Sequence, residues 1–430
     1  MDLKTMRRLD RHLGVPLCAA LTLWQRAKSL FVKPEARPIE SVLFVKLAEQ
    51  GSTVLAVSAF RKAIERVGRE NVHFICFEEN RFILDLMDLI PKENVITIKT
   101  GGLVGTMTNF LGGIRKARAL KPSVSIDLEF FSRSSAILTY LSGADRRVGF
   151  HASNEEGPWR GDLMTHRLRF TPHLHTADLY RFMVDAMDLD GTKLPAIPFV
   201  PVRVEDEPPV FAPSASERER VLKVIEEAAG TREFRPLVLL NANCSDLIPL
   251  RAWPRERYVE LAQRLLADDP KLRIAFTGAP NEAGPAQKLV EKIGSGRCFC
   301  LAGKTSLRDL LVVFGFADVL VTNDSGPAHF ASLTHVQVVT LFGPETPALF
   351  ASRSPRSHIL WRELACSPCV SALNNRDSRC TDNLCMQSIT VDEVERLVKS
   401  LLTSEPEPMS VEVKLPVITR QQARADFPAR

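Results

Sequence analysis

Residues 321–347 read VTNDSGPAHFASLTHVQVVTLFGPETP. Two apolar runs of strand length flank a polar cluster that begins at Asn323 and a stretch of helical composition. A strand, turn, helix and second strand in this order are typical of a parallel sheet, whose ligands bind beyond the carboxyl ends of the strands. The segment therefore predicts an α/β fold with a polar site at residues 323–329.

The polar cluster is suited to an anionic ligand at the start of a helix. Asp324 can accept a hydrogen bond from a hydroxyl group, and His329 can donate one to a phosphate. Ser325 and Gly326 are small and allow the backbone to approach a ligand closely. The alternative interpretation is an ordinary turn, in which Asp324 or Ser325 only caps the helix.

The same alternation of apolar runs and helical periodicity extends over most of the chain and falls into two series. An acidic, proline-rich passage at 199–220 separates them, and the tail after residue 403 has no clear periodicity. The runs expected to form strands are 41–47, 72–77, 95–98 and 124–130 in the first series, and 236–242, 273–278, 299–303, 319–324 and 338–343 in the second. Short buried runs with helices between them predict two doubly wound halves.

Composition limits the class of function. The 430 residues are 45% hydrophobic and 25% charged, with a net charge of +5, and the first 40 residues carry eight Lys or Arg against four Asp or Glu. The rest of the chain is therefore nearly neutral, which argues against a nucleic-acid groove. Nine cysteines without an export signal indicate free thiols in a reducing cytoplasm.

The N-terminal segment contains the apolar run LGVPLCAALTL at 13–23, with basic residues on both sides. A membrane-spanning helix needs about 20 apolar residues, so this run is too short, and no small-residue cleavage site follows it. We expect a basic amphipathic helix over residues 1–40 that lies on an anionic membrane surface. The alternative is an additional helix packed on the body.

Several motifs together resemble the ADP-heptose:lipopolysaccharide heptosyltransferases (glycosyltransferase family 9). They include LVTNDSGPAHFASLTHVQVVTLFGPETP, LAGKTSLRDL before it, the strand and Trp-Pro helix in LVLLNANCSDLIPLRAWPRERYVELAQRL, and VLFVKLAEQGSTVLAVSAFRKAIE in the first half. The resemblance covers about residues 41–400. It implies a GT-B fold, an inverting, metal-independent transfer, and a donor nucleotide-sugar held by the C-terminal domain.

The resemblance also assigns donor-binding residues. Asp324, Ser325, Gly326 and His329 match the family's donor-binding Asp-Thr/Ser-Gly-x-x-His. Arg251 falls where the family has a lysine that reaches the donor phosphates, and a guanidinium keeps that charge. Glu282 lies two residues beyond the column of the family's ribose-binding acidic residue, which is Pro280 here.

The chain departs from the family at the first glycine turn. The family usually has Gly-Asp there, and this Asp is its general base, whereas this chain has Gly51-Ser52. An unassisted serine is not a base near neutral pH, so Glu49 in the same turn is the first candidate. Glu129 is the second candidate, and Asp127 on the same strand is an alternative to it. Each carboxylate could equally lie in a loop without a catalytic role.

Four cysteines near the C-terminus have the spacing C-x2-C-x10-C-x4-C. Four thiols can enclose a structural zinc ion in a reducing compartment. Disulfides and free thiols are the alternatives, because this spacing is not that of a common zinc module. The residues are Cys366, Cys369, Cys380 and Cys385.

The expected domains are a basic N-terminal segment (1–40), an acceptor-side Rossmann-like domain (41–205), a nucleotide-sugar-binding Rossmann-like domain (206–403) and a tail (404–430). The expected function is transfer of a sugar, heptose from ADP-heptose, onto a lipopolysaccharide-type or other cell-surface glycan at the inner face of the membrane. No cofactor is needed for this transfer, and no nucleic acid is expected as a partner. A non-catalytic nucleotide-sugar-binding protein and a nucleotide-sugar epimerase are the alternatives. The epimerase needs a set of acid and base side chains that we cannot identify in the first half.

Overall fold

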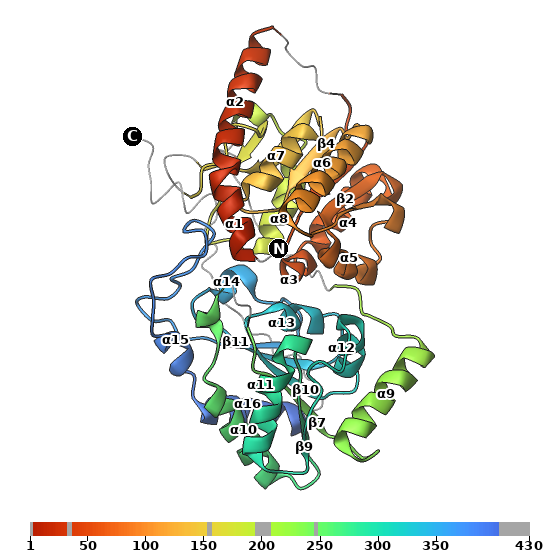
Figure 1. The fold of residues 1–430 in the computed structure, drawn as a ribbon, viewed down its shortest axis with the longest axis vertical. Helices are drawn as coiled ribbons and strands as arrows, with labels where there is room; N and C mark the ends of the chain where they lie inside the picture. Colours follow the sequence, from red (N-terminus) through yellow and green to blue (C-terminus); the bar gives the residue numbers. More distant parts are fainter. Residues whose placement is uncertain (1–2, 32–36, 153–156, 194–207, 245–247, 404–430) are drawn as a thin grey trace, which may run out of the picture.

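The computed structural model describes residues 3–31, 37–152, 157–193, 208–244 and 248–403. They form two α/β domains, each built on its own sheet (Figure 1). The expected tail at 404–430 and part of the expected linker lie outside the described residues. The part of that linker from Ala215 onward is the start of a helix, because Ser214 caps its first turn.

The first sheet has six parallel strands in the order β3-β2-β1-β4-β5-β6. Its strands are β1 (Val42–Val45), β2 (Val72–Phe77), β3 (Val95–Ile98), β4 (Val124–Asp127), β5 (Arg146–Phe150) and β6 (His166–Leu168). The first four fall in the apolar runs expected to be strands. The last two were not expected.

Helices cover both faces of this sheet, as burial of strands on both sides requires. They are α1 (Leu3–His12), α2 (Gly14–Phe31), α3 (Gln50–Val54), α4 (Val57–Val67), α5 (Arg81–Met87), α6 (Leu103–Ala119), α7 (Arg133–Leu141) and α8 (Thr176–Ala186). Short 3-10 turns are η1 (Arg69–Asn71), η2 (Glu78–Asn80), η3 (Lys92–Asn94) and η4 (Gly191–Lys193).

The second sheet repeats the plan, with six parallel strands in the order β12-β11-β10-β7-β8-β9. Its strands are β7 (Leu237–Asn241), β8 (Arg273–Phe276), β9 (Cys298–Cys300), β10 (Val319–Asn323), β11 (Gln337–Leu341) and β12 (Ser357–Leu360). Its helices are α9 (Ala215–Ala229), α10 (Arg255–Asp268), α11 (Ala283–Ile293), α12 (Leu307–Phe314), α13 (Gly326–Ala331), α14 (Pro347–Phe350), α15 (Leu384–Gln387) and α16 (Val391–Thr403), with 3-10 turns η5 (Pro249–Arg251) and η6 (Pro280–Glu282).

The strand orders fix where a ligand site can lie. The direction of winding reverses between β1 and β4 in the first sheet and between β7 and β10 in the second. Such switch points leave a crevice beyond the carboxyl ends of the strands. Glu49 follows β1 and Glu129 follows β4, while Asp324 follows β10. The sheets therefore bring the expected base candidates and donor residues to the two switch points.

The N-terminal helices pack on the first domain and also expose an apolar surface. Cys18 of α2 is buried in a cluster with Ala136 and Ile137 of α7. The carboxylate of Asp10 in α1 accepts the backbone N–H groups of Arg133 and Ser134, at 3.0 and 2.8 Å, at the start of α7. The expected basic segment thus has features of both alternatives. No helix in the described part of the chain is long and apolar enough to cross a membrane.

Candidate active site

The turn after β1 forms the first-domain side of the site. Glu49 adopts a left-handed conformation, with φ of 65°, and precedes the short helix α3. Gly51 in that helix lies against α13 of the second domain: a Cβ atom there would stand 2.7 Å from Cδ2 of His329. Only a glycine permits this approach, which is closer than real Cβ contacts. The turn that carries Glu49 is therefore held directly against the expected donor residues.

Glu49 also contacts Ser52, which stands in the position of the family's aspartate. The hydroxyl of Ser52 donates to the backbone oxygen of Glu49 at 3.0 Å and to its Oε2 at 3.3 Å. Glu49, the first candidate for the base, and Ser52, at the position of the family's base, are therefore hydrogen-bonded to each other. Ser52 is buried, and its hydroxyl is oriented toward Glu49.

Glu129 lies beside this turn, beyond the end of β4. Its Oε1 accepts the backbone N–H of Ala48 at 2.9 Å, and its Oε2 is 3.8 Å from Nζ of the buried Lys46. Burial raises the pKa of Glu129 although Lys46 opposes this shift. Asp127 is fully buried and pairs with Arg160 at 2.7 Å. Asp127 is therefore part of the scaffold, out of reach of an acceptor.

The second-domain side is built around Asp324 and Arg251. Nη1 of Arg251 donates to the backbone oxygen of Asp324 at 3.0 Å and lies 3.5 Å from its Oδ2. His329, on α13, is buried nearby. The hydroxyl of Ser325 donates to the backbone oxygen of Asn323 at 3.1 Å, and Gly326 begins α13. All five expected donor residues of this region lie at the carboxyl end of β10 or against it.

Two further residues complete the site, and sequence reasoning missed both. Arg376 forms an ion pair with Glu49 of the first domain, and its Nε is 3.4 Å from Oε1 of Glu345. Glu345 also lies 3.4 Å from Nη2 of Arg251. The guanidinium of Arg376 stands over the rings of Phe130 and Phe350, at 5.7 and 5.3 Å from their centroids. Arg376 therefore links the two domains across the site.

The sequence contains little that points to Glu345 or Arg376 as site residues. Glu345 lies in the quoted stretch, in GPETP after the second apolar run, at the same sheet edge as Asp324. Arg376 has no such marker, because it lies in an irregular segment and also adopts a left-handed conformation, with φ of 54°. It is 327 positions from its partner Glu49.

The charges of the cluster set its protonation. Burial opposes ionisation of Glu49, but the positive charges of Arg376, Lys46 and Arg251 outweigh burial and lower its pKa to about 2. Burial raises the pKa of Asp324 and of Glu345 against the attraction of the two arginines. Burial and the charge of Arg251 lower the pKa of His329 to about 4, so its imidazole is neutral at pH 7.

Several buried polar atoms of this cluster make no hydrogen bond within the described residues. They are Nε of Arg251, Oδ2 of Asp324, Nδ1 of His329, Oε1 of Glu345 and Nζ of Lys46. The atoms of Asp324, Glu345 and Lys46 lie 3.4 to 3.8 Å from an oppositely charged atom. Nε of Arg251 and Nδ1 of His329 have no hydrogen-bond partner among the described residues, and such buried groups are rare and call for an explanation. Hydrogen-bond donors and acceptors converge here. A ligand with phosphate and hydroxyl groups requires this arrangement.

Glu282 lies apart from this cluster. It is the last residue of η6, and its Oε2 accepts the backbone N–H of Ala279 at 2.7 Å. Its carboxylate thus stabilises its own turn, and no ion pair or hydrogen bond joins it to Arg251 or Arg376 in the described structure. The ribose contact expected from the sequence has no direct support in this geometry.

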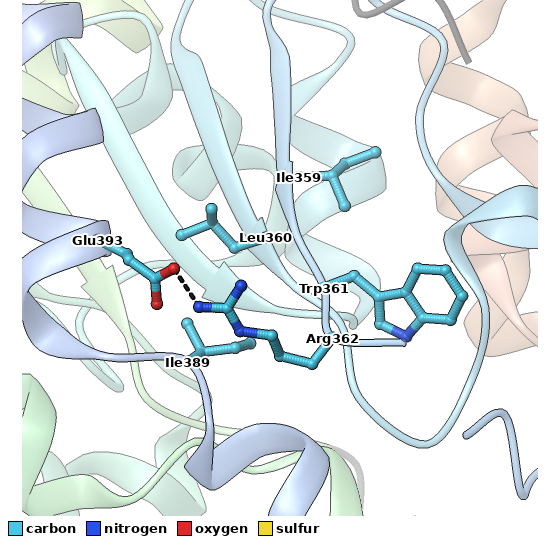
Figure 2. Close-up of a pocket in the computed structure, with 6 residues that line it drawn as sticks. All are labelled: Ile359, Leu360, Trp361, Arg362, Ile389 and Glu393. Atoms are coloured by element: carbon cyan, nitrogen blue, oxygen red, sulfur yellow. Dashed lines mark hydrogen bonds and ion pairs between the residues drawn. The ribbon is translucent and has the colours of Figure 1, made fainter. Parts of the chain in front are cut away.

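A separate pocket of about 90 Å³ lies between β12 and α16. Figure 2 shows the ion pair of Arg362 and Glu393 across it, with Trp361 pointing away from that pair. The other lining residues shown are Ile359, Leu360 and Ile389. The pocket is small and its charges are already paired, so it is not a candidate for the nucleotide-sugar.

The four C-terminal cysteines do not form a metal site in the structure. All four are free thiols, and Cys366 and Cys380 are exposed. The thiol of Cys380 donates to the backbone oxygen of Asp382 at 3.0 Å. No group of three or more His, Cys, Asp or Glu side chains is arranged to hold a metal ion in the part of the chain that is described. Burial raises the pKa of Cys385, and the nearby Cys369 and Cys380 add to this shift, so three of the thiols are neighbours without the arrangement of a metal site.

Comparison with known families assigns the chain. Residues 130–378, more than half of it, match the family model of glycosyltransferase family 9 (heptosyltransferase). The chain belongs to this family. Among curated proteins, it is 24% identical over 237 residues to lipopolysaccharide heptosyltransferase 2 of Salmonella typhimurium, covering 53% of this chain and 62% of that protein. It is 30% identical over 106 residues to lipooligosaccharide heptosyltransferase 2 of Campylobacter jejuni, covering 24% of this chain and 31% of that protein.

Each of these matches spans less than two thirds of the curated relative. Solved structures of glycosyltransferase family 9 match over a longer range. ADP-heptose lps heptosyltransferase II of E. coli superposes with a TM-score of 0.60 at 17% identity, covering 84% of this chain and 98% of that one. The family 9 structure from Veillonella parvula gives a TM-score of 0.63 at 17% identity, covering 85% and 99%. The fold is therefore GT-B, as expected from the sequence.

Proposed function

We propose that this family 9 protein is an inverting glycosyltransferase that moves a sugar from a nucleotide-sugar onto a hydroxyl of a cell-surface glycan. The observation that carries the proposal is the meeting of Glu49 from the first domain with Arg251, Asp324 and His329 from the second. A carboxylate and a set of phosphate- and hydroxyl-binding groups that meet between two domains are what such a transfer needs. ADP-heptose is the donor and a lipopolysaccharide-type glycan the acceptor, by likeness to the relatives named above.

The donor occupies the second-domain side. Arg251 and Arg376 would hold the diphosphate, because two guanidinium groups can bind its oxygens and stabilise the charge that it gains on leaving. His329 would donate one hydrogen bond to a phosphate oxygen, which a neutral imidazole can do. Asp324 would accept a hydrogen bond from a sugar hydroxyl, close to the small residues Ser325 and Gly326.

Glu49 would serve as the general base. The acceptor hydroxyl gives its proton to the carboxylate while its oxygen forms the new bond to the anomeric carbon, and the bond to the diphosphate breaks on the opposite face. Arg376 holds Glu49 at a pKa of about 2, which weakens a base at neutral pH. The donor diphosphate competes for Arg376, so donor binding would raise the proton affinity of Glu49 when the base is needed.

A nucleotide-release assay tests the function. The protein is incubated with ADP-heptose, and separately with UDP-sugars, with and without a truncated lipopolysaccharide acceptor. Acceptor-dependent release of ADP supports the proposal. Binding of a nucleotide-sugar without turnover for any acceptor would instead identify a non-catalytic binding protein, which the serine at position 52 would explain.

Replacing Asp324 or His329 with Ala should weaken donor binding by about 10- to 100-fold, because a lost hydrogen bond to a charged group is worth roughly 1.5–3 kcal/mol. Calorimetric titration with the donor measures the effect. His335→Ala is a matched control, since this histidine is exposed on the same segment. Unchanged affinity in both site variants would show that the donor binds elsewhere.

Replacing Arg376 with Gln should move the acid limb of the kcat/KM profile upward by roughly two pH units, toward an ordinary carboxyl pKa of about 4.3. The carboxylate acts only when ionised, so activity falls as pH falls through the pKa of Glu49. That pKa is about 2 while Arg376, Lys46 and Arg251 face the carboxylate, and the largest of these attractions is removed.

The measurement is kcat/KM from pH 3 to pH 8, a range in which the limb of the variant lies and that of the unmodified protein does not. Arg376→Lys keeps a positive charge and should retain most of the low pKa. Equal profiles in the Gln variant and the unmodified protein would mean that Arg376 does not govern Glu49 in solution.

We further propose that the protein acts in the cytoplasm, on the inner surface of the membrane that holds its acceptor. The first 40 residues carry an excess of basic side chains, and α2 exposes apolar ones. Anionic lipid attracts such a helix.

A further inference from the structure

A second apolar surface lies on the first domain, away from the N-terminal segment in the sequence. Helix α6 exposes Leu103, Val104, Met107 and Leu111, with 77% of Val104 and 59% of Leu111 accessible. These positions follow helical spacing and share one face of the helix. The adjoining side is packed toward the C-terminal end of the helix, where Ile114 and Ala117 are buried and Gly113 lies against Ile98 of β3.

Helix α2 exposes a similar surface. Its outward side chains are Leu17, Leu23, Trp24, Leu30 and Phe31, of which Trp24 is 66% and Phe31 87% accessible. Most of the exposed large hydrophobic side chains in the described chain belong to these two helices and the residues that join α1 to α2. Single exposed hydrophobic residues are normal, but a gathering of this size marks an interaction surface.

The two helices lie on the same side of the first sheet. Helix α7 packs against both, with α2 along one flank and α6 along the other (Figure 1). The core residues beneath α6 and α7 come from one face of the sheet, including Leu43, Val45 and Ile98. Their outer surfaces therefore form one face, which we call the α2–α7–α6 face.

The charge of this face is of one sign. The sequences of α2, α6 and α7 contain no Asp or Glu. They carry Arg26, Lys28, Arg115, Lys116, Arg118 and Arg133, of which Arg26 and Arg133 are paired with acidic residues from outside these helices. The acidic residues at its border are engaged: Asp162 pairs with Arg26, and Asp10 caps α7. Exposed apolar stripes flanked only by basic groups are complementary to an anionic lipid surface.

We propose that the α2–α7–α6 face is a lipid-docking surface, on which α2 and α6 insert their apolar side chains into an anionic bilayer at two separate places. This proposal extends the membrane location proposed above. The reason for docking, which is access to the acceptor, rests on the proposed function. Two contacts hold the domain in one orientation, whereas a single helix would allow it to rotate. The lipid surface is the occupant, rather than a second copy of the chain, because two such basic faces would repel each other.

The test uses the full chain and lipid vesicles, without any sugar donor, so its outcome does not depend on catalysis. Vesicles of phosphatidylcholine alone are compared with vesicles that contain phosphatidylglycerol. The double variant Val104→Ser/Leu111→Ser should bind the anionic vesicles at least about tenfold more weakly, since each side chain loses the burial of several methyl or methylene groups. Arg115→Gln/Lys116→Gln should lose about fivefold for each charge and reduce the salt dependence.

Leu384→Ser is the matched control, because Leu384 is 55% exposed in the other domain and should not affect vesicle binding. Unchanged thermal unfolding of the variants confirms that they fold, as expected for side chains without inward contacts. Vesicle binding of both α6 variants equal to that of the unmodified protein would overturn the proposal. So would sedimentation as a dimer that the α6 variants abolish, because the face would then bind a second copy.

Discussion

Replacing Glu49 with Gln is expected to lower kcat by about 10²–10⁴-fold, the usual contribution of general-base assistance. The amide has nearly the same shape as the carboxylate but cannot take the proton of the acceptor hydroxyl. Donor affinity should not fall, because the donor groups belong to the second domain and Arg376 is released from Glu49 to bind the diphosphate. Single-turnover rates and calorimetric donor affinities separate the two effects.

Ser52→Ala is the control in the same turn. Its hydroxyl donates to Glu49 at 3.0 and 3.3 Å, and a single neutral hydrogen bond contributes about 1 kcal/mol, so the loss should stay below about tenfold. Full turnover in the Glu49→Gln variant would exclude this residue. Glu129→Gln is then the next variant to measure, because Glu129 lies beside the same turn and its pKa is raised by burial.

The sequence was sufficient for the fold class because buried parallel strands read as continuous apolar runs. β2 and β3 coincide with their expected ranges, and β7 to β11 each begin within one residue of the expected start. The strands that were missed are short or polar at one end. β5 begins with two arginines, β6 has three residues, and β12 begins with Ser357 and His358. Pairing with a neighbouring strand makes these segments extended, and a single sequence does not contain that information.

The residues of the site also divide into those that the sequence predicts and those that it does not. Asp324 and His329 could be predicted, because they lie in a local motif at the end of an apolar run. Arg376 could not, since its place depends on how two domains meet and on an irregular segment with no periodicity. Its ion pair with Glu49 joins two left-handed residues from different domains. The charge of the unpredicted arginine thus lowers the pKa of the predicted base, a coupling that only the tertiary structure reveals.

The buried pair of Asp127 and Arg160 supports this site from behind. Asp127 Oδ1 accepts the backbone N–H of Glu129 at 3.1 Å, while Arg160 donates to the backbone oxygen of Phe150 at 2.9 Å from Nε. The pair therefore joins the end of β4, which carries the second base candidate, to β5. Sequence reasoning considered Asp127 as an alternative base, and its complete burial assigns it to this scaffold instead.

Arg160→Met should destabilise the protein by about 3–5 kcal/mol at pH 8, the cost of leaving a buried charge without its partner. Burial raises the pKa of Asp127 to about 6 although Arg160 opposes this shift. Stability linked to this carboxyl is therefore present below about pH 4 and is lost as pH rises through about 6. Removing Arg160 raises the pKa further, so the variant should lose less stability at pH 5 than at pH 8.

Denaturant unfolding at the two pH values measures this difference. The double variant Asp127→Asn/Arg160→Met has no buried charge at this position and should recover most of the loss at pH 8, with little dependence on pH. A cost that is equal at pH 5 and pH 8, or that the asparagine does not relieve, would mean that Arg160 stabilises the fold through its bonds to backbone oxygens. In that case the charge of Asp127 is not what holds the end of β4 in place, and the position of Glu129 depends on the backbone contacts of Arg160.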